Sequence, residues 1–536
     1  MASIITNNFR RNSVSLLVNS VRSTNEYYIG IGKSDSWPND ENGRSEDSSL
    51  FIPPIPNNSQ IENFDALNNL IGLVKTNDAT PLIPRNEWVA GRVYKQYDTT
   101  DPNLFNLTVD NGVERYPCYV TFSDKTYICL SNNDNAQSTS EIPSNYDDFK
   151  DTVNNTTIRE TNDGYIWAYV QTLSTLPDED FNTDSFISVK EELDENTQLT
   201  DIQNAKEATG GLIYGFVIEN GGSGINPSDQ ITLVGRGEDN SVKSDILISD
   251  GSTSTPFSVT INSGEITELK ITDLVGSKNI LANYESASVI VDNHPEVIIT
   301  PLIAPKEGFG FNARKDLPSF YAGISAKLQG DVENEIPTNI SFRQVSLIRK
   351  VSRNILTFSD STFTSNITGK SNTYYVDNST GTIYTWNGSI FVVESGLSLS
   401  DIDNTGIVYG PSGAIDTLEF FTFDTSSNFN QLFETGSIIT QIATGAKAFL
   451  DSVDLSNQKV FFHQNSSPSI NLKKFDPNEQ QIEIEQPNGT ITSDNFLELS
   501  QSEYVFKTGS ILFLENRKRI IRDSNQDENI KLVIQH

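Results

Sequence analysis

Cysteines, histidines and long apolar runs are scarce in this chain. Its 536 residues include two cysteines, Cys118 and Cys129, in one candidate hairpin. A secreted disulfide scaffold would carry more, so we expect two buried, reduced thiols. No apolar run approaches the roughly 20 residues of a membrane span, and residues 14–18 are too short and polar for a signal peptide. The sequence therefore predicts a protein made and assembled in a reducing cytoplasm, with no membrane partner.

Basic residues are also few. Lysine and arginine together number 38 against 71 aspartates and glutamates, which gives a net charge of −33. Such a charge repels phosphates and anionic lipids. We therefore expect no nucleic-acid or membrane binding, and partners that present basic patches.

Motifs of enzyme chemistry are missing from the sequence. The three histidines, His294, His463 and His536, have no metal-ligand spacing, and no nucleophile elbow or phosphate-binding loop is present. The sequence accordingly predicts no enzyme, no catalytic residue, no cofactor and no metal site. A glycan depolymerase is a further reading, but no residue can be nominated for it.

Short apolar runs between polar turns are abundant. With 36% hydrophobic residues and many Asn, Ser, Thr and Asp residues, the composition favours strands and turns over helical bundles. The length predicts three or four domains. A hairpin is expected at 374–377 and 381–388, and two related β units at 211–218 and 264–271 indicate an inserted sandwich or barrel-like module. The predicted fold is therefore mainly β and multidomain.

Few helices are expected. Residues 6–21 fit a short helix capped by Thr6 or Asn7, and residues 60–75 fit the best helix of the chain. The latter begins with a capping box, Ser59 followed by Glu62. A further acidic, helical segment is indicated at 188–207. The prolines of 51–56 (FIPPIP) predict an extended segment.

The last stretch, 508–536, is predicted to form two strands joined by a long hairpin loop that close a sheet begun elsewhere. Its loop concentrates cations in an acidic chain: Arg517, Lys518, Arg519 and Arg522. These cations either pair with the chain's own acids or dock an acidic partner. Two interpretations are also open for the tryptophans Trp37, Trp88, Trp167 and Trp386. They either pack in hydrophobic cores with one ring edge exposed to solvent, or they form interfaces or platforms on which sugars stack. The residues argue for a non-enzymatic interaction protein.

Several motifs, in one order, resemble a known family. They are YYIGIGKSDSWPND (27–40), IPRNEWVAGRVYKQYD (83–98), NDGYIWAYV (162–170), SFRQVSLIRK (341–350) and TGSILFLENRKRI (508–520). Together with the extended prolines, they resemble the baseplate wedge subunit of contractile-tailed phages of the T-even type, in the long version carried by marine phages. The resemblance marks Trp37, Trp88, Trp167, Phe342, Arg343, Gln344, Glu515 and Asn516 as structural motif residues.

The resemblance implies a structural virion protein in the tail baseplate. It would be a homodimer bound to other wedge subunits, and tail-fibre attachment proteins are a further class of partner. The expected core is discontinuous, comprising 1–209, 304–352 and 496–536, with β modules inserted at 210–303 and 353–495. An alternative function is a receptor- or carbohydrate-binding tail protein that uses the inserted modules.

Overall fold

A computed structural model describes most of the chain. The described residues are 4–24, 26–143, 157–173, 181–190, 209–251, 256–328, 340–351, 355–366, 369, 374–387, 389–396, 398, 414–500, 502, 504, 508–523 and 526–536. Most of the helical segment predicted at 188–207 lies outside these ranges.

The chain forms two compact units. Unit 1 comprises Met1–Leu16, Thr80–Gly323 and Gln535–His536, and unit 2 comprises Leu17–Ala79 and Ile324–Ile534. Four elements have residues in both units: α1 (Asn7–Thr24), β3 (Asp78–Pro84), β19 (Tyr321–Leu328) and β34 (Glu528–Gln535). The division into a core and inserted modules expected from the sequence stays a prediction.

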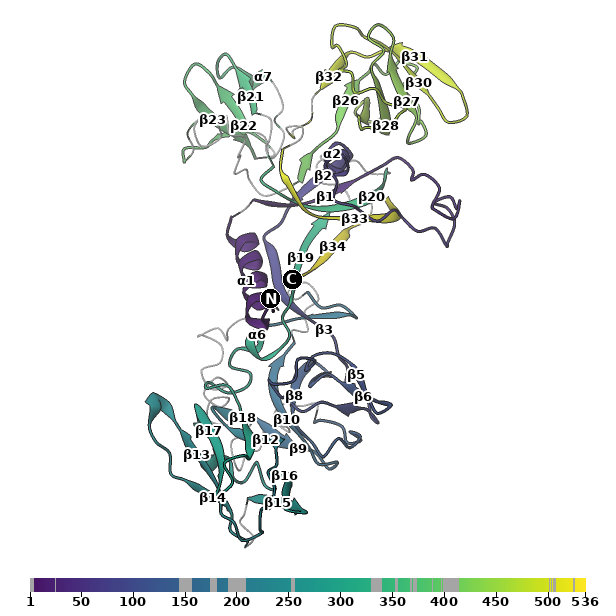
Figure 1. Cartoon of the computed structure of the whole chain (residues 1–536). Helices are drawn as coiled ribbons and strands as arrows, with labels where there is room; N and C mark the ends of the chain where they lie inside the picture. Colours follow the sequence, from purple (N-terminus) through teal and green to yellow (C-terminus); the bar gives the residue numbers. More distant parts are fainter. Residues whose placement is uncertain are drawn as a thin grey trace. The chain divides into compact units, whose positions relative to one another are not determined.

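Unit 1 consists mainly of short strands, coloured blue to teal in Figure 1. Its first strands are β4 (Val93–Tyr94), β5 (Thr108–Asp110), β6 (Val113–Tyr116), β7 (Tyr119–Phe122), β8 (Lys125–Asn132), β9 (Ile158–Glu160), β10 (Tyr165–Thr172) and β11 (Phe186–Ser188). The later elements are β12 (Ile213–Asn220), β13 (Ile231–Arg236), η1 (Glu238–Asn240), β14 (Ile246–Ser249), β15 (Phe257–Asn262), β16 (Glu265–Ile271), α5 (Lys278–Leu281), β17 (Ser286–Val291), β18 (Ile298–Ile303) and α6 (Ala313–Asp316).

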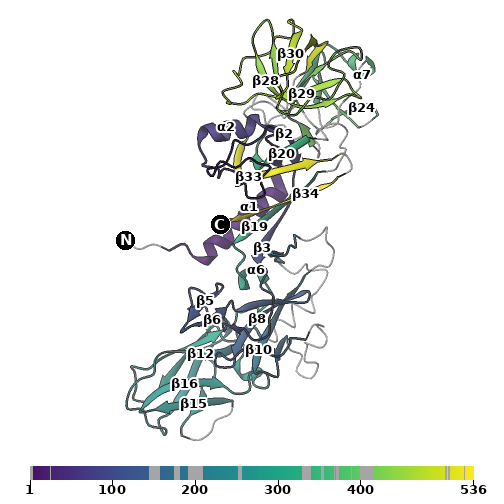
Figure 2. The same cartoon turned by 90° about the vertical axis from the view of Figure 1, so that its right-hand side faces the viewer.

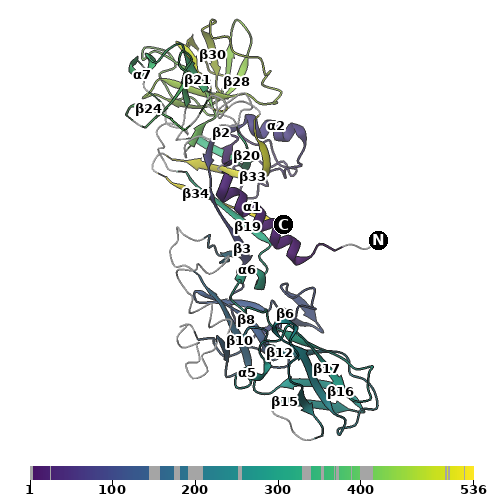
Figure 3. The same ribbon diagram turned by 90° about the vertical axis from the view of Figure 1, so that its left-hand side faces the viewer.

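One hydrophobic cluster connects the earlier and later strands of unit 1. The sheets run in the orders β7-β8-β10-β9, β4-β6-β5, β14-β13-β17, β12-β18 and β15-β16. Ile128 of β8 and Leu233 of β13 belong to the same buried cluster, and Figure 3 shows β12 beside β8. Cys118 and Cys129 are free and buried, as predicted, with the Cys129 amide donating to the Cys118 carbonyl at 2.7 Å.

The two predicted repeat segments of unit 1 become strands β12 and β16. They meet at a glycine turn, where the Ile266 amide donates to the Gly221 carbonyl at 2.9 Å. A Cβ atom at Gly221 would lie 2.2 Å from the Ile266 oxygen, so only glycine fits this close approach.

Unit 2 contains the longest strands. Its first elements are β1 (Tyr27–Gly32), α2 (Gln60–Asn68), β2 (Leu70–Lys75), β20 (Ile340–Arg349), β21 (Ile355–Phe358), α7 (Phe363–Asn366), β22 (Tyr374–Asp377), β23 (Thr382–Trp386), β24 (Phe391–Val393) and β25 (Ala414–Asp416). The remaining strands are β26 (Glu419–Thr422), β27 (Ile438–Gln441), β28 (Lys447–Asp454), β29 (Lys459–His463), β30 (Gln481–Glu485), β31 (Ile491–Asn495), β32 (Glu498–Ser500) and β33 (Ser510–Arg522).

Three sheets organise unit 2. The central one has the order β25-β2-β1-β20-β33, so the late strand β33 joins a sheet begun by β1. The predicted hairpin appears as β22 and β23 within β21-β22-β23-β24, and a seven-stranded sheet runs β31-β30-β27-β28-β29-β26-β32. Figure 2 shows α2 next to the central sheet. The predicted mainly β, multidomain fold with few helices is confirmed.

Three sequence predictions need correction. The helix expected over 60–75 ends at Asn68, and residues 70–75 form the buried strand β2 instead. The capping box is half formed: Ser59 accepts from the Glu62 amide at 3.2 Å, but Glu62 accepts from Asn57 and Asn58.

The third correction concerns the C-terminal stretch. The expected loop residues 515–519 lie inside the continuous strand β33. Strand β34 belongs to a different sheet, so β33 and β34 do not form a hairpin.

Candidate docking surface

A β-bulge in β33 turns the basic triplet of the chain outward. Strand β33 pairs antiparallel with β20, and the register shifts between Phe342, opposite Ile520, and Gln344, opposite Asn516. Arg343 therefore lies opposite three residues, Arg517, Lys518 and Arg519, and all three are exposed. Extra residues in one strand bend it and redirect their side chains. The bulge thus presents three consecutive cations at the sheet edge.

Arg343 itself points inward and forms a buried ion pair. Its Nη2 and Nε atoms each lie 2.6 Å from a carboxylate oxygen of Glu46, and the two side chains are 3% and 8% exposed. Arg343 Nη1 also donates to the Ser341 hydroxyl at 3.1 Å and to the Ser34 carbonyl. Burial by itself would raise the pKa of Glu46, but the Arg343 guanidinium outweighs it and holds the pKa below its usual value. The bidentate geometry fixes the segment containing Glu46 against β20.

The segment 33–59, which we call the strap, lies along β33. Trp37 Nε1 donates to the Arg517 carbonyl at 2.9 Å, and Lys518 Nζ donates to the Ser49 carbonyl at 2.6 Å. Asn516 of β33 connects the strap to β20. Its Nδ2 donates to the Pro54 carbonyl of the strap, and its Oδ1 accepts from Gln344 Nε2 of β20, each at 2.9 Å. The strap therefore covers part of a sheet edge that would otherwise offer free backbone groups.

The four predicted interface cations divide into exposed and buried members. Arg517 pairs with Glu515 at 3.1 Å and Arg519 approaches Asp47 at 3.9 Å, both at solvent-exposed positions. Exposed pairs of this kind contribute about 1 kcal/mol or less and exchange partners readily. Arg522 is fully buried and pairs with Glu528 at 3.3 Å. A docking role for the cations stays a prediction, and only the bulge triplet is accessible for it in the isolated chain.

The motif residues fall into two groups. Trp37, Phe342, Gln344, Glu515 and Asn516 gather with Arg343 at the strap and the β20–β33 pair of unit 2. The other two belong to unit 1. Trp88 Nε1 donates to the Ser138 hydroxyl at 3.0 Å, whereas Trp167 is fully buried on β10 and stacks on Tyr165 at 5.5 Å.

A second buried ionic cluster in unit 2 joins the strap to the seven-stranded sheet. His463 of β29 lies between two carboxylates, with its Nδ1 2.9 Å from Asp451 Oδ1 and its Nε2 3.6 Å from Asp35 Oδ1. The Ser34 hydroxyl also donates to Asp451. Burial alone would lower the pKa of His463, but the two carboxylates outweigh it and raise the pKa to about 9. The imidazole is therefore charged near neutral pH and holds the two segments together.

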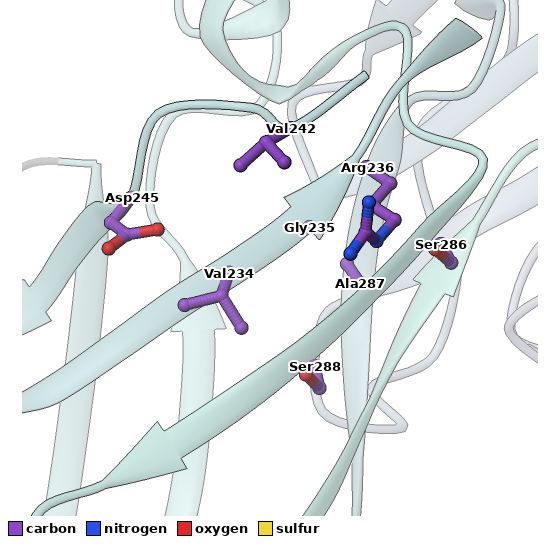
Figure 4. Close-up of a pocket in the computed structure, with 8 residues that line it drawn as sticks. All are labelled: Val234, Gly235, Arg236, Val242, Asp245, Ser286, Ala287 and Ser288. Atoms are coloured by element: carbon purple, nitrogen blue, oxygen red, sulfur yellow. The ribbon is translucent and has the colours of Figure 1, made fainter. Parts of the chain in front are cut away.

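A shallow hollow of about 320 Å³ lies on the outer face of the β13–β17 pair in unit 1 (Figure 4). Its lining residues are Val234, Gly235, Arg236, Val242, Asp245, Ser286, Ala287 and Ser288. Arg236 lies opposite Ser286 in the strand register, and its Nη1 donates to the Asn240 carbonyl at 3.1 Å. The hollow offers a guanidinium, a carboxylate and hydroxyls, which suit a small polar ligand.

Over the described residues, no cluster of three or more His, Cys, Asp or Glu side chains has the geometry of a metal site. No helix in the same part of the chain is long and apolar enough to cross a membrane.

Sequence reasoning missed Glu46, Asp35, Asp451 and the role of His463. An arginine within the apolar strand run at 341–350 signals a buried cation that needs a carboxylate partner. Nothing in the sequence selects that partner among 71 acidic residues.

We predict that Arg343→Ala destabilises unit 2 by about 3–5 kcal/mol, because Glu46 would remain buried without its counterion. Arg349→Ala is the matched control: Arg349 also lies on β20 and pairs with Glu26 at 2.9 Å, but its side chain is partly exposed. Thermal unfolding followed by circular dichroism measures both variants. Equal losses of stability in the two variants would contradict the prediction that the buried Arg343–Glu46 pair contributes more to the free energy of unfolding than the Arg349–Glu26 pair.

We also predict that His463→Gln destabilises the chain in a pH-dependent way. A folded-state pKa of about 9, above the ordinary value of 6.5, adds stability that is complete below pH 6.5 and lost as pH rises through 9. The shift corresponds to about 3 kcal/mol. The difference between wild type and variant in chemical denaturation should therefore shrink between pH 7 and 10. A pH-independent difference between wild type and variant would contradict this prediction.

Comparison with known proteins gives a match at the N-terminal part of the chain. The family model described as "Phage-Gp8: Bacteriophage T4, Gp8" matches residues 3–114 of the 536. This region contains the whole strap. No curated protein matches the chain. The match confirms the resemblance predicted from the sequence and supports a T4-type baseplate wedge protein.

Proposed function

We propose that this chain is a baseplate wedge subunit of a contractile phage tail, which joins neighbouring wedge proteins and supports fibre attachment and contraction. The family match supports a phage baseplate structural protein. The match over the strap is the observation that carries the finer proposal, because the strap is hydrogen-bonded to the strand that presents the exposed cations. Its role is mechanical, without catalysis, and its site is the tail baseplate of the virion.

The proposed partners are other wedge subunits, tail-fibre attachment proteins and a second copy of the chain. A net charge of −33 disfavours non-specific self-association. Specific contacts are therefore expected at local surfaces that carry less negative charge than the rest of the chain. The bulge triplet of Arg517, Lys518 and Arg519 is such a surface. It is exposed, cationic and held in place by the pairing of β33 with β20.

The proposal is tested first on the whole particle and on the purified chain. We expect mass spectrometry and electron microscopy of purified tails to find the chain in the baseplate. Mass photometry of the isolated protein should give twice the 59.4 kDa of one chain. A monomer that is absent from the tail would end this proposal.

We predict that the double reversal Arg517→Glu and Arg519→Glu lowers wedge assembly while the isolated fold survives. Both side chains are exposed, and their own ion pairs contribute little stability. Sedimentation of assembled wedges measures the effect. Reversal of Lys473 and Lys474, also exposed, changes the net charge equally and serves as control. Unchanged assembly of the Arg517→Glu and Arg519→Glu variant would mean that these cations only pair with acidic residues of their own chain.

A second candidate function, binding of a receptor or carbohydrate, is favoured by the hollow around Arg236. Its guanidinium, carboxylate and hydroxyl groups resemble the polar sets that orient small ligands. Glycan-array binding by the full chain that Arg236→Ala abolishes, and Lys270→Ala preserves, would favour this alternative. Absence of glycan and cell binding would remove it.

A further inference from the structure

The strap contains a short ridge of exposed apolar side chains, residues 50–56. Leu50, Ile52 and Ile55 are 66%, 60% and 86% exposed, whereas Phe51 between them is buried and anchors the ridge. Apolar side chains so exposed and so close together are typical of interaction sites. The ridge lies within the strap and belongs to no strand or helix.

Prolines determine how this ridge can be recognised. Pro53, Pro54 and Pro56 have no backbone N–H, so the ridge cannot add to a partner's sheet as a regular strand. Pro53 and Pro56 are spaced by one turn of a polyproline II helix, which has three residues per turn. Pro-x-x-Pro segments of this kind dock in grooves lined by aromatic side chains.

The ridge is held in place before any partner binds. The Pro54 carbonyl accepts from Asn516, the Leu50 carbonyl accepts from Arg44 at 2.6 Å, and the Ile52 amide donates to Asp40 at 3.4 Å. Beyond the prolines, Glu62 accepts from the amides of Asn57 and Asn58 at 2.6 and 2.8 Å. A segment already fixed in its bound form loses little conformational entropy on docking.

The exposed cations of β33 border the ridge. Lys518 donates to the Ser49 carbonyl, and Arg517 and Arg519 flank it in the bulge. An apolar ridge with a cationic border, in a chain of net charge −33, fits a groove whose rim carries carboxylates. The cationic border therefore selects for a partner groove with an acidic rim.

We propose that residues 50–56 are a polyproline-type ligand for an aromatic-lined groove on a different baseplate protein, whose acidic rim pairs with Arg517, Lys518 and Arg519. This rests on the proposed function, because it requires the chain to reside in the baseplate. The partner's groove supplies aromatic rings that stack on Pro53 and Pro56 and an apolar floor for Ile55.

Photo-crosslinking in assembled tails tests the ridge directly. The photoreactive amino acid p-benzoylphenylalanine is placed at position 55 of the full chain, and at position 61 as control. Ile61 is also 69% exposed but lies on α2, outside the proline segment. We expect position 55 to crosslink to a different baseplate protein, at a peptide rich in aromatic and acidic residues, roughly tenfold more than position 61. Equal crosslinking at both positions, or crosslinks to a second copy alone, would overturn the inference.

Failure of the inference and of the proposed function give different results. If the chain is found in tails but position 55 does not crosslink, only the inference falls. If mass spectrometry finds no chain in the tails, both fall. As a second readout, Ile55→Asp should keep the circular dichroism spectrum and lower the amount of chain in tails roughly tenfold, whereas Ile61→Asp should not. Normal incorporation of Ile55→Asp would also count against the ridge.

Discussion

The ion pair between Arg343 and Glu46 is the contact on which the surface of unit 2 depends. Two buried charges are costly to remove from water, and only close bidentate geometry with additional hydrogen bonds compensates for that. Arg343 has this geometry, and it also reaches the Ser34 carbonyl at the start of the strap. Because both side chains are buried, detaching the strap from β20 would leave Arg343 without its counterion. The pair therefore favours one position of the strap strongly.

The bulge in β33 lies directly opposite Arg343. With Arg343 directed inward, three residues of β33 lie opposite it and their charged side chains turn to solvent. Trp37 and Lys518 then make hydrogen bonds between strap and bulge. The acidic chain thereby has a small cationic, partly apolar surface. A surface that differs in charge from the rest of the chain allows specific recognition by a complementary partner. His463, buried between Asp35 and Asp451, extends the fixed region to the seven-stranded sheet.

Local patterns in the sequence predicted the elements whose structure depends on neighbours along the chain. The hairpin of β22 and β23 and the cap at Ser59 are of this kind. Residues 70–75 have apolar residues that fit a helix, but pairing with β1 and β25 makes them a strand. Tertiary pairing of this sort overrides local preference.

The same limit applies to the candidate surface. The cations at 517–519 suggested a loop, because three consecutive charged residues break the alternation of apolar and polar residues in a strand. The residue that lies opposite them in the sheet, Arg343, is more than 170 positions away in the sequence. The family resemblance marked Trp37, Arg343 and Asn516 as motif residues, and all three lie at the strap and the β20–β33 pair. It did not show that Glu46 joins them, because contacts between distant segments leave no local pattern.

Hydrogen–deuterium exchange of the full chain, compared with Glu46→Gln, tests most directly whether the Arg343–Glu46 pair fastens the strap. Loss of the pair should raise exchange of the amides in residues 33–59 and 516–519 by about a hundredfold or more, since breaking a buried pair costs several kcal/mol. Amides of β27–β30 should keep their protection. Unchanged exchange in the strap, or a uniform increase over all of unit 2, would contradict the account.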